Sequence, residues 1–391
     1  MRKMDPMEKT YFTSESVTRG HPDKVCDQIA DAILDAVLAQ DPESHVACEV
    51  TACMDQVHIF GEISTDANVD YETIARGVIR EIGYTEFGHG FDAETCRVTV
   101  DLRQQSADIA RGICRSAASE ALDAGAGDQG MMFGFACTQT KHLMPLPIEL
   151  AHALSKKLES VRRSGQLHFL LPDGKSQVTV EYERNVPKRI ATVVLSAQHQ
   201  PGIRTAELRE ALLSHVILPT LPEEMLDERT QFFINPTGRF VEGGPAADSG
   251  LTGRKLIVDT YGGYARHGGG AFSGKDATKV DRSGAYMARY MAKNIVAGGL
   301  AQECEVQLSY AIGLADPMSI RVDTFGTGIV SDALLCQAIA DQVDARPAAI
   351  MQKFDLRAPR FSRVSCYGHF GSNASEMPWE QIDTGLMDLG V

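Results

Sequence analysis

Residues 267–281, HGGGAFSGKDATKVD, hold a dense set of side chains that could do chemistry. Consecutive glycines let backbone N–H groups approach an anion closely, because no Cβ holds the anion away. Lys275 and Lys279 are four residues apart, as on one face of a helix that starts there, so their mutual repulsion favours a strongly negative ligand between them. Asp276 and Asp281 could hold a divalent cation against the same anion. The segment therefore predicts a polyphosphate site with magnesium.

Two familiar phosphate-binding motifs come close to matching but fail in their context. Residues 269–275 fit G-x-x-x-x-G-K, but Asp276 stands where a P-loop needs Ser or Thr for magnesium. GAGDQG at 125–130 fits the dinucleotide fingerprint, which requires a strand before it and a helix after it. A helix-like segment precedes GAGDQG and the apolar run MMFGFA follows it. A flexible glycine loop with solvated charges would explain the glycines of 267–281, but not paired lysines beside two aspartates.

Other charged motifs could serve the same anion, although each also has an ordinary structural explanation. GHPDK places His21 and Asp23 at a helix N-terminus, where the macrodipole favours an anion, but N-capping would also explain them. Asp173 in LPDGKSQ is typical of a turn, and carboxylates on strands are usually solvated. Six cations could together neutralise a triphosphate: Lys175, Arg239, Arg254, Lys255, Lys275 and Lys279.

The hydrophobic periodicity predicts the same order of elements three times along the chain. The first third reads as a helix at 22–39, strands at 46–51 and 57–63, a helix at 70–82 and a strand at 98–102. The middle third reads as a helix at 148–163, strands at 177–183 and 190–197, a helix at 206–217 and a strand at 231–235. The last third reads as a helix at 283–296, strands at 304–312 and 318–324, a helix at 331–344 and a weaker strand at 362–367. Another strand, KLIVDTY, is expected at 255–261.

This repeat predicts an α+β fold of three similar units around a pseudo-threefold axis, each a mostly antiparallel sheet with helices on one face. A glycine-bearing polar loop precedes the first helix of each unit, at 19–24, 125–130 and 267–281. Functional residues are expected in these equivalent loops, because loops on a rigid scaffold commonly carry binding and catalytic groups.

Composition excludes several classes of protein. The net charge of −14 over 391 residues argues against a general binder of nucleic acid or membrane surfaces. No apolar run approaches the roughly 18–20 residues that cross a membrane, and the N-terminal extension lacks the apolar core of a secretory signal. The nine cysteines are scattered without a C-x-x-C pair, so we expect reduced thiols, a cytoplasmic location and no structural zinc.

Six motifs, in this order and at these separations, resemble the S-adenosylmethionine synthetase (methionine adenosyltransferase) family: GHPDK, GAGDQG, PDGKSQV, INPTGRF, GLTGRK and GGGAFSGKD. The resemblance runs from about residue 11 to YGHFG at 367–371. It implies three α+β domains, at 9–107, 121–241 and 242–381. It also implies a cytoplasmic enzyme of EC 2.5.1.6, which transfers the adenosyl group of ATP to the sulfur of L-methionine and then hydrolyses the triphosphate to pyrophosphate and phosphate.

The resemblance also implies site residues and partners. A sulfur nucleophile needs no base, so catalysis would rest on aligning sulfur with C5′ and stabilising the departing triphosphate with cations and magnesium. Two Mg²⁺ per site and K⁺ are expected, in a homo-oligomer, a dimer of dimers with active sites at the dimer interface. The implied catalytic residues are His21, Lys175, Arg254 and Lys275, with Asp173, Arg239, Phe240, Asp248, Lys255 and Ala271 also at the nucleotide; Glu62, Gln105, Asp248 and Lys279 at methionine; Asp23 and Asp281 at Mg²⁺; Glu49 at K⁺; and Asp128 in the active-site wall.

The chain departs mildly from the family pattern. Residues 105–115 correspond to a gating loop. Gln104, directly before this loop, and Ala107 within it differ from the more usual basic residue and proline. Arg19 replaces a more usual acidic residue before GHPDK, and Tyr264 stands where methionine is common. Two alternatives remain at this point. A P-loop kinase or ATPase would yield ADP and no sulfonium product, and an inactive regulatory paralogue would be free to lose charged positions that this chain retains.

Overall fold

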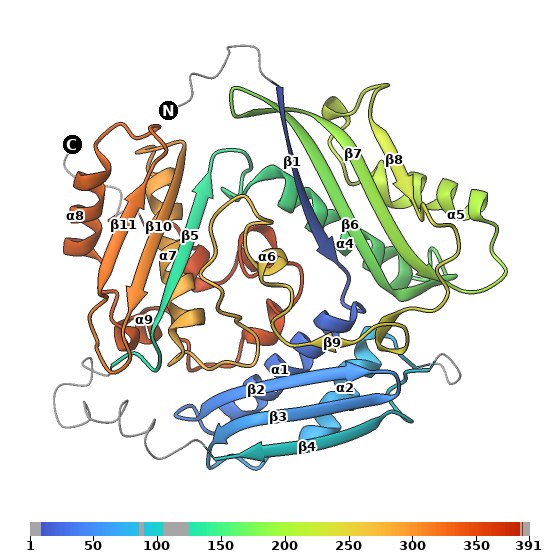
Figure 1. Cartoon of the computed structure of the whole chain (residues 1–391), viewed down its shortest axis with the longest axis horizontal. Helices are drawn as coiled ribbons and strands as arrows, with labels where there is room; N and C mark the ends of the chain where they lie inside the picture. The colour runs from blue at the N-terminus through green and yellow to red at the C-terminus, as the bar shows by residue number, and fades with distance from the viewer. Residues whose placement is uncertain (1–8, 86–89, 105–124, 384, 386–391) are drawn as a thin grey trace.

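The computed structural model describes residues 9–85, 90–104, 125–383 and 385. Three sheets are arranged around a common centre, with helices packed behind them (Figure 1). Most strand pairs are antiparallel, and only β3–β4 and β7–β8 run parallel in the described part of the chain. The predicted α+β class with three similar units is confirmed.

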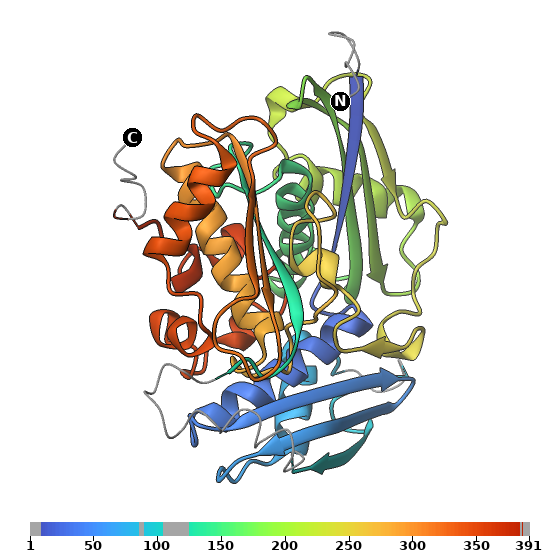
Figure 2. The same cartoon turned by 60° about the vertical axis from the view of Figure 1, so that its left-hand side comes forward.

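The first sheet has the strand order β4-β3-β2-β9, and α1 packs directly on β2. Alternate residues of β2, such as Val46, Cys48 and Val50, are fully buried, as expected for a strand with one face in the core. Figure 2 shows α1 lying between this sheet and the rest of the molecule. The elements are α1 (Pro22–Leu38), β2 (His45–Cys53), β3 (Gln56–Ser64), α2 (Tyr71–Ile82), β4 (Arg97–Arg103) and the short β9 (Gly250–Leu251).

The second sheet has the order β1-β6-β7-β8 and the third has the order β11-β10-β5. The second comprises β1 (Lys9–Val17), β6 (Leu170–Glu183), β7 (Val186–His199) and β8 (Gln231–Ile234), with helices α4 (Leu146–Arg163) and α5 (Thr205–Leu212). The third comprises β5 (Gly130–Cys137), β10 (Glu303–Tyr310) and β11 (Ser319–Asp323), with α7 (Val280–Ala297), α8 (Asp332–Gln342) and α9 (Pro347–Phe354).

The three sheets exchange strands in a cycle. Strand β1, from the first third of the chain, pairs with β6 in the second sheet. Strand β5, from the middle third, pairs with β10 in the third sheet, and β9, from the last third, pairs with β2 in the first sheet. The exchange ties the thirds together and brings loops from different thirds beside one another. Thus the β1–β6 register sets Lys175 opposite Val17, only four residues before His21.

Two predicted strands are wrong. Residues 255–261 contain the one-turn helix α6 (Leu256–Asp259), and 362–367 begin within a 3₁₀ turn (Phe361–Arg363) and continue as turns and bends instead of forming a strand. Short apolar runs do not distinguish a buried strand from a buried turn of helix. The place expected for 362–367 in the third sheet is taken by β5. In addition, the predicted helix at 206–217 closes with a π-helical turn, Leu213–Ile217.

A buried ion-pair cluster fastens the C-terminal segment to α7. Glu380 is fully enclosed and accepts hydrogen bonds from Arg289 Nε at 2.8 Å and Lys293 Nζ at 2.7 Å. Burial opposes its ionisation, but Arg289 and Lys293 together hold the pKa of this carboxyl below its usual value. The segment beyond α9 is therefore attached by charge as well as by the stacked rings of Tyr286 and Trp379.

We expect Glu380→Gln to destabilise the protein by about 3–5 kcal/mol, because it leaves a buried arginine without its counter-charge. Glu376→Gln is the matched control, because the Arg363–Glu376 pair has side chains 61% and 77% exposed. An exposed pair contributes about 1 kcal/mol or less. Denaturant unfolding followed by circular dichroism compares the two variants. Equal shifts in the two midpoints would contradict the structural role of Glu380.

Within the described ranges, no helix has both the length and the apolar composition needed to cross a membrane. The eight cysteines in these ranges are all free thiols, and six of them are buried.

Candidate active site

The turn before α1 positions a buried, neutral histidine. His21 is the N-cap of α1, and its Nδ1 accepts a hydrogen bond from the Asp23 backbone N–H at 3.2 Å. Burial, together with the nearby charges of Lys255 and Lys175, lowers the pKa of His21 to about 3. The ring is therefore neutral at physiological pH, and because Nδ1 is the acceptor, the ring hydrogen resides on Nε2.

Asp23 pairs with two cations, Arg254 and Lys255, from a turn that is distant in sequence. Its side chain lies 2.6 Å from Lys255 Nζ and 3.4 Å from Arg254 Nε, and it accepts the Leu251 N–H at 3.1 Å. Burial opposes ionisation of Asp23, but the Lys255 ammonium beside it lowers the pKa of the carboxyl. The carboxylate is thus ionised and already paired.

Asp173 and Lys175 of β6 lie near His21 and the turn before α1. Lys175 is exposed, and its charge contributes to the depressed pKa of His21. Asp173 is buried, and its Oδ2 accepts the Gly244 N–H at 2.9 Å. Its Oδ1 has no hydrogen-bond partner among the described residues, and burial raises its pKa to about 6. The exposed Asp248 adds to that rise, which places its charge nearby.

The remaining nucleotide residues of the INPTGRF motif are less constrained. Arg239 is exposed and makes no hydrogen bond or ion pair with another described residue. The Phe240 backbone N–H donates to His199 Nε2 at 3.1 Å, which fixes the main chain at the end of β7. The structure therefore places Arg239 on the surface without joining it to the other predicted cations.

The glycine-rich segment forms a second group. Lys275 Nζ lies 2.8 Å from Asp281 Oδ2, in the first turn of α7. Lys279 is the N-cap of α7, and its Nζ lies 2.5 Å from Asp276 Oδ2. The prediction that the two lysines share a helix face is wrong, because α7 begins only at Val280. Each lysine has its own carboxylate in this structure.

Asp276 anchors the loop instead of sharing a metal ion with Asp281. It is buried and accepts hydrogen bonds from the Val46 N–H at 2.6 Å and from both the N–H and the hydroxyl of Thr278. Burial opposes its ionisation, but Lys279 lowers the pKa of Asp276. With all of these donors in place, the carboxylate has no capacity left for a cation.

Strand β2 brings Glu49 to the same segment. The Cys48 N–H donates to the Gly274 carbonyl at 2.9 Å, so the chain before Lys275 lies along β2. Burial raises the pKa of Glu49 to about 6, against the opposing effect of Lys275 and with a smaller contribution from Glu62. A Cβ on Gly270 would lie 2.1 Å from Asp281 Oδ1, so a glycine is needed where the loop passes this carboxylate.

GAGDQG borders the second group. The Gly127 N–H donates to the Thr278 carbonyl at 3.4 Å, and a Cβ on Gly130 would lie 3.6 Å from Asp281 Oδ1. Asp128 is exposed, and its carboxylate caps the Gln129 N–H at 2.7 Å. Gln105 and the predicted gating loop lie outside the described residues.

The predicted residues thus fall into two groups. The first group contains His21, Asp23, Asp173, Lys175, Asp248, Arg254 and Lys255. The second group contains Glu49, Glu62, Lys275, Lys279 and Asp281, with Asp128 at its border. Among the described residues no hydrogen bond or ion pair joins the two groups. Ala271 lies between them, since a Cβ on Gly253 would lie 2.6 Å from the Ala271 Cβ.

The sequence analysis missed a buried charged network beneath both groups. Lys24 Nζ lies 3.0 Å from Asp27 and also pairs with Asp259. Arg282 of α7 makes two hydrogen bonds to Asp31, at 2.8 and 2.7 Å. The sequence feature that could have predicted this network is the spacing of four residues between the aspartates along 22–38. That spacing is also typical of an ordinary solvent-facing polar stripe on a helix.

The carboxylates suit a divalent cation only in partnership with a phosphate ligand. Among the described residues, no group of three or more His, Cys, Asp or Glu side chains is arranged to hold a metal ion. Asp23 and Asp281 are ionisable oxygen donors of the kind that Mg²⁺ uses, and Mg²⁺ is commonly held by one or two carboxylates plus substrate phosphates. The donor set therefore fits a cation that arrives with a polyphosphate.

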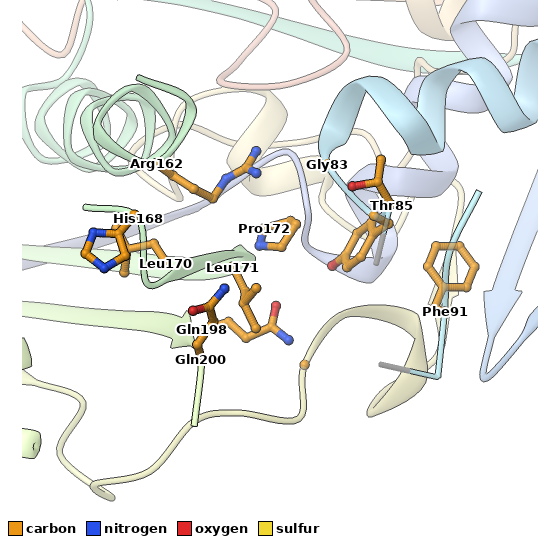
Figure 3. Close-up of a pocket in the computed structure, with 12 residues that line it drawn as sticks. Gly83, Thr85, Phe91, Arg162, His168, Leu170, Leu171, Pro172, Gln198 and Gln200 are labelled. Carbon is orange, nitrogen blue, oxygen red and sulfur yellow. The ribbon is translucent and has the colours of Figure 1, made fainter. Parts of the chain in front are cut away.

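A cavity of about 220 Å³ is lined by Leu170, Leu171 and Pro172, which directly precede Asp173 in the sequence, and by residues of other segments (Figure 3). Figure 3 shows Arg162, His168, Leu170, Pro172 and Gln198 around it, with Phe91 across from them. None of the residues predicted to bind ATP or methionine lines this cavity.

Comparison with known families gives three adjoining matches. The model described as S-adenosylmethionine synthetase, N-terminal domain, matches residues 9–107. The central-domain model matches 123–240 and the C-terminal-domain model matches 242–381. Together they span nearly all of the described chain.

Proposed function

Because this chain belongs to the S-adenosylmethionine synthetase family, we propose that the two groups described above are the two halves of its active site. The chain is a methionine adenosyltransferase, EC 2.5.1.6, and forms S-adenosylmethionine from ATP and methionine. One observation carries the assignment of the halves: each predicted metal-binding carboxylate is paired with a predicted phosphate-binding lysine, at 2.6 Å for Asp23–Lys255 and 2.8 Å for Asp281–Lys275.

We infer that these four side chains form the triphosphate site. In the complex with ATP, Lys255 and Lys275 would contact phosphate oxygens, and Asp23 and Asp281 would hold the divalent cation. The family requires a divalent metal. We propose two Mg²⁺ per site, which would neutralise charge on the leaving triphosphate. Lys175 and Arg254 extend the cationic surface, and Asp173, Arg239, Phe240, Asp248 and Ala271 complete the nucleotide site.

The proposed methionine-binding residues carry charges opposite to those of the methionine ammonium and carboxylate groups. Glu62 and Asp248 are exposed carboxylates that suit the methionine ammonium group, and Lys279 suits its carboxylate, with Gln105 as a further contact. Lys279 already contacts Asp276 at 2.5 Å, so it would contact methionine through its remaining hydrogens. We propose Glu49 for K⁺, since a carboxyl with a pKa of about 6 is ionised at neutral pH.

The chemistry needs alignment more than proton transfer. A lone pair on the methionine sulfur attacks C5′, the C5′–O bond breaks, and the triphosphate departs with the bonding electrons. We propose that His21 donates its Nε2 hydrogen toward the oxygen that accumulates charge. Water then hydrolyses the retained triphosphate to pyrophosphate and phosphate.

We propose that a second copy of the chain completes the site, in a dimer that pairs into a tetramer. The lack of hydrogen bonds and ion pairs between the two groups, within the described ranges, supports this proposal. Each sheet also exposes a large apolar side chain on an edge strand: Tyr11 on β1, Val100 on β4 and Met131 on β5, at 59%, 45% and 48%. We further propose three domains, 9–107, 121–241 and 242–381, linked by the exchanged strands.

We expect Asp281→Asn to raise the Mg²⁺ concentration for half-maximal activity by about tenfold or more, because one charged oxygen ligand becomes neutral. The measurement is a Mg²⁺ titration of S-adenosylmethionine formation at saturating substrates. Asp332→Asn is the matched control, because Asp332 also lies in the first turn of a helix but contacts Thr324, away from the site. An unchanged Mg²⁺ titration in Asp281→Asn would remove this residue from the metal site.

A further inference from the structure

Helix α1 carries four aspartates at intervals of four residues, and each accepts at least one backbone N–H group from the last third of the chain. This spacing keeps successive side chains on neighbouring positions of one helix face. Figures 1 and 2 show the helix running beneath β9 and along the first sheet, where loops from the last third reach it. The acceptors and their donors are Asp23 to Leu251 at 3.1 Å, Asp27 to Gly253 at 2.9 Å, Asp31 to Gly274 at 2.9 Å, and Asp35 to Arg360, Phe361 and Ser362 at 2.9 Å each.

Asp27 and Asp31, the two central aspartates, make the same kind of contact beneath the first and the second group. Gly253, bound by Asp27, directly precedes Arg254 and Lys255. Gly274, bound by Asp31, directly precedes Lys275. Both glycines have positive φ, +77° and +80°, a conformation that side-chain-bearing residues rarely adopt. In each case a buried carboxylate fixes the last peptide N–H before a predicted phosphate-binding cation.

We propose that Asp27 and Asp31 are positioning residues, which fix the cation-bearing turns in the geometry that the triphosphate needs. The inference rests on the proposed function of Arg254, Lys255 and Lys275. A glycine turn is flexible by nature, so the direction of the next side chain depends on what anchors the peptide. Misplacing a catalytic group by about 1 Å can lower a rate by about a hundredfold.

The turn before Arg254 is anchored on its other side as well. Thr252 Oγ1 accepts the Val50 N–H at 2.8 Å, and the Thr252 N–H donates to the Val50 carbonyl at 3.0 Å. These bonds attach the segment to β2 whether or not Asp27 is present. Loss of the Asp27 carboxylate therefore frees the peptide at Gly253, directly before Arg254 and Lys255, while the bonds between Thr252 and Val50 stay in place.

Asp27 is also the aspartate that can be removed without stranding a buried charge. Lys24 pairs with both Asp27 and Asp259, so Asp27→Ala leaves one lysine beside one carboxylate. Removing Asp31 would instead leave Arg282 buried without its carboxylate partner. Asp27 is accordingly the residue on which the proposal is best tested.

The experiment compares Asp27→Ala, Asp27→Asn and the control Asp35→Ala in the full-length protein. Asparagine keeps an oxygen that can accept the Gly253 N–H, whereas alanine does not. Asp35 anchors residues 360–362 through the same kind of bond, outside the predicted site. The readouts are kcat and KM for ATP and for methionine, and amide hydrogen exchange of peptides that cover residues 250–256.

We expect Asp27→Ala to lower kcat by about 10- to 100-fold, to change KM for methionine less than twofold, and to speed exchange at 250–256. Asp27→Asn retains most of the activity, and Asp35→Ala keeps kcat within twofold of wild type. Wild-type kcat in Asp27→Ala, unchanged exchange at 250–256, or equal losses of kcat in Asp27→Ala and Asp35→Ala would overturn the positioning role. Failure of the wild-type protein to form S-adenosylmethionine would instead overturn the proposed function, and the exchange measurement does not depend on activity.

Discussion

Lys275→Met is expected to lower turnover by about 10²- to 10³-fold, the loss typical when one preorganised group that stabilises transition-state charge is removed. Methionine keeps a long apolar stem but cannot donate to a phosphate oxygen. Folding should be affected little, because the loop is held by its backbone. The Lys275 carbonyl accepts from Arg282 at 2.9 Å, and the preceding Gly274 bonds both Cys48 and Asp31.

The side chain of Lys275 is 21% exposed and that of its partner Asp281 is 24% exposed, so removing the pair leaves a carboxylate that water can reach. We therefore expect the melting temperature to fall by no more than a few degrees. Lys156→Met is the control, because Lys156 is an exposed lysine of α4 that contacts Asn373 at 3.4 Å, outside both groups. Steady-state kinetics and thermal unfolding give the two readouts. Activity near wild type in Lys275→Met would contradict the phosphate role.

His21→Asn is expected to lower kcat by about 10²- to 10³-fold while preserving α1, again by loss of one charge-stabilising donor. Asparagine is a favourable N-cap, so its side chain can accept the Asp23 N–H in place of Nδ1. Its shorter side chain does not reach the point where Nε2 carries the ring hydrogen. The substitution therefore separates the capping function of His21 from its proposed contact with the departing oxygen.

The pH dependence sharpens this test. Since burial lowers the pKa of His21 to about 3, the ring stays neutral throughout the range from pH 6 to pH 9. The ratio of wild-type to His21→Asn activity should then be constant across that range. A ratio that falls as the pH rises through 6–7 would show that protonated His21 acts as a cation, contrary to this account. Far-ultraviolet circular dichroism confirms that the helix is retained.

The sequence predicted those elements whose pattern is local. The helix at 22–38 follows from Pro22 at its start and from apolar residues at intervals of four, and the hairpin at 45–64 follows from alternation about a short turn. The cyclic exchange of β1, β5 and β9 could not be predicted in this way. A strand's own alternation does not reveal which distant strand it will pair with, and β9 is only two residues long.

The site was predictable to a similar degree. Glycine-rich motifs with lysine and arginine identified the loops that the structure gathers into two groups, and the family matches agree with the resemblance that these motifs carry. The buried aspartates that anchor these loops could not be predicted from the sequence. The sequence analysis made no prediction for Asp27 and Asp31, yet both are buried and bind glycine N–H groups that lie more than 200 positions away. Individual ligand assignments, such as Glu62 for methionine, stay predictions.

The most direct test of the account is to identify the products that the purified protein forms from ATP, L-methionine and Mg²⁺, with and without K⁺. Mass spectrometry and ³¹P NMR should detect S-adenosylmethionine, pyrophosphate and phosphate in equal amounts, formed faster when K⁺ is present. Formation of ADP without a sulfonium product, or no turnover of methionine under these conditions, would contradict it.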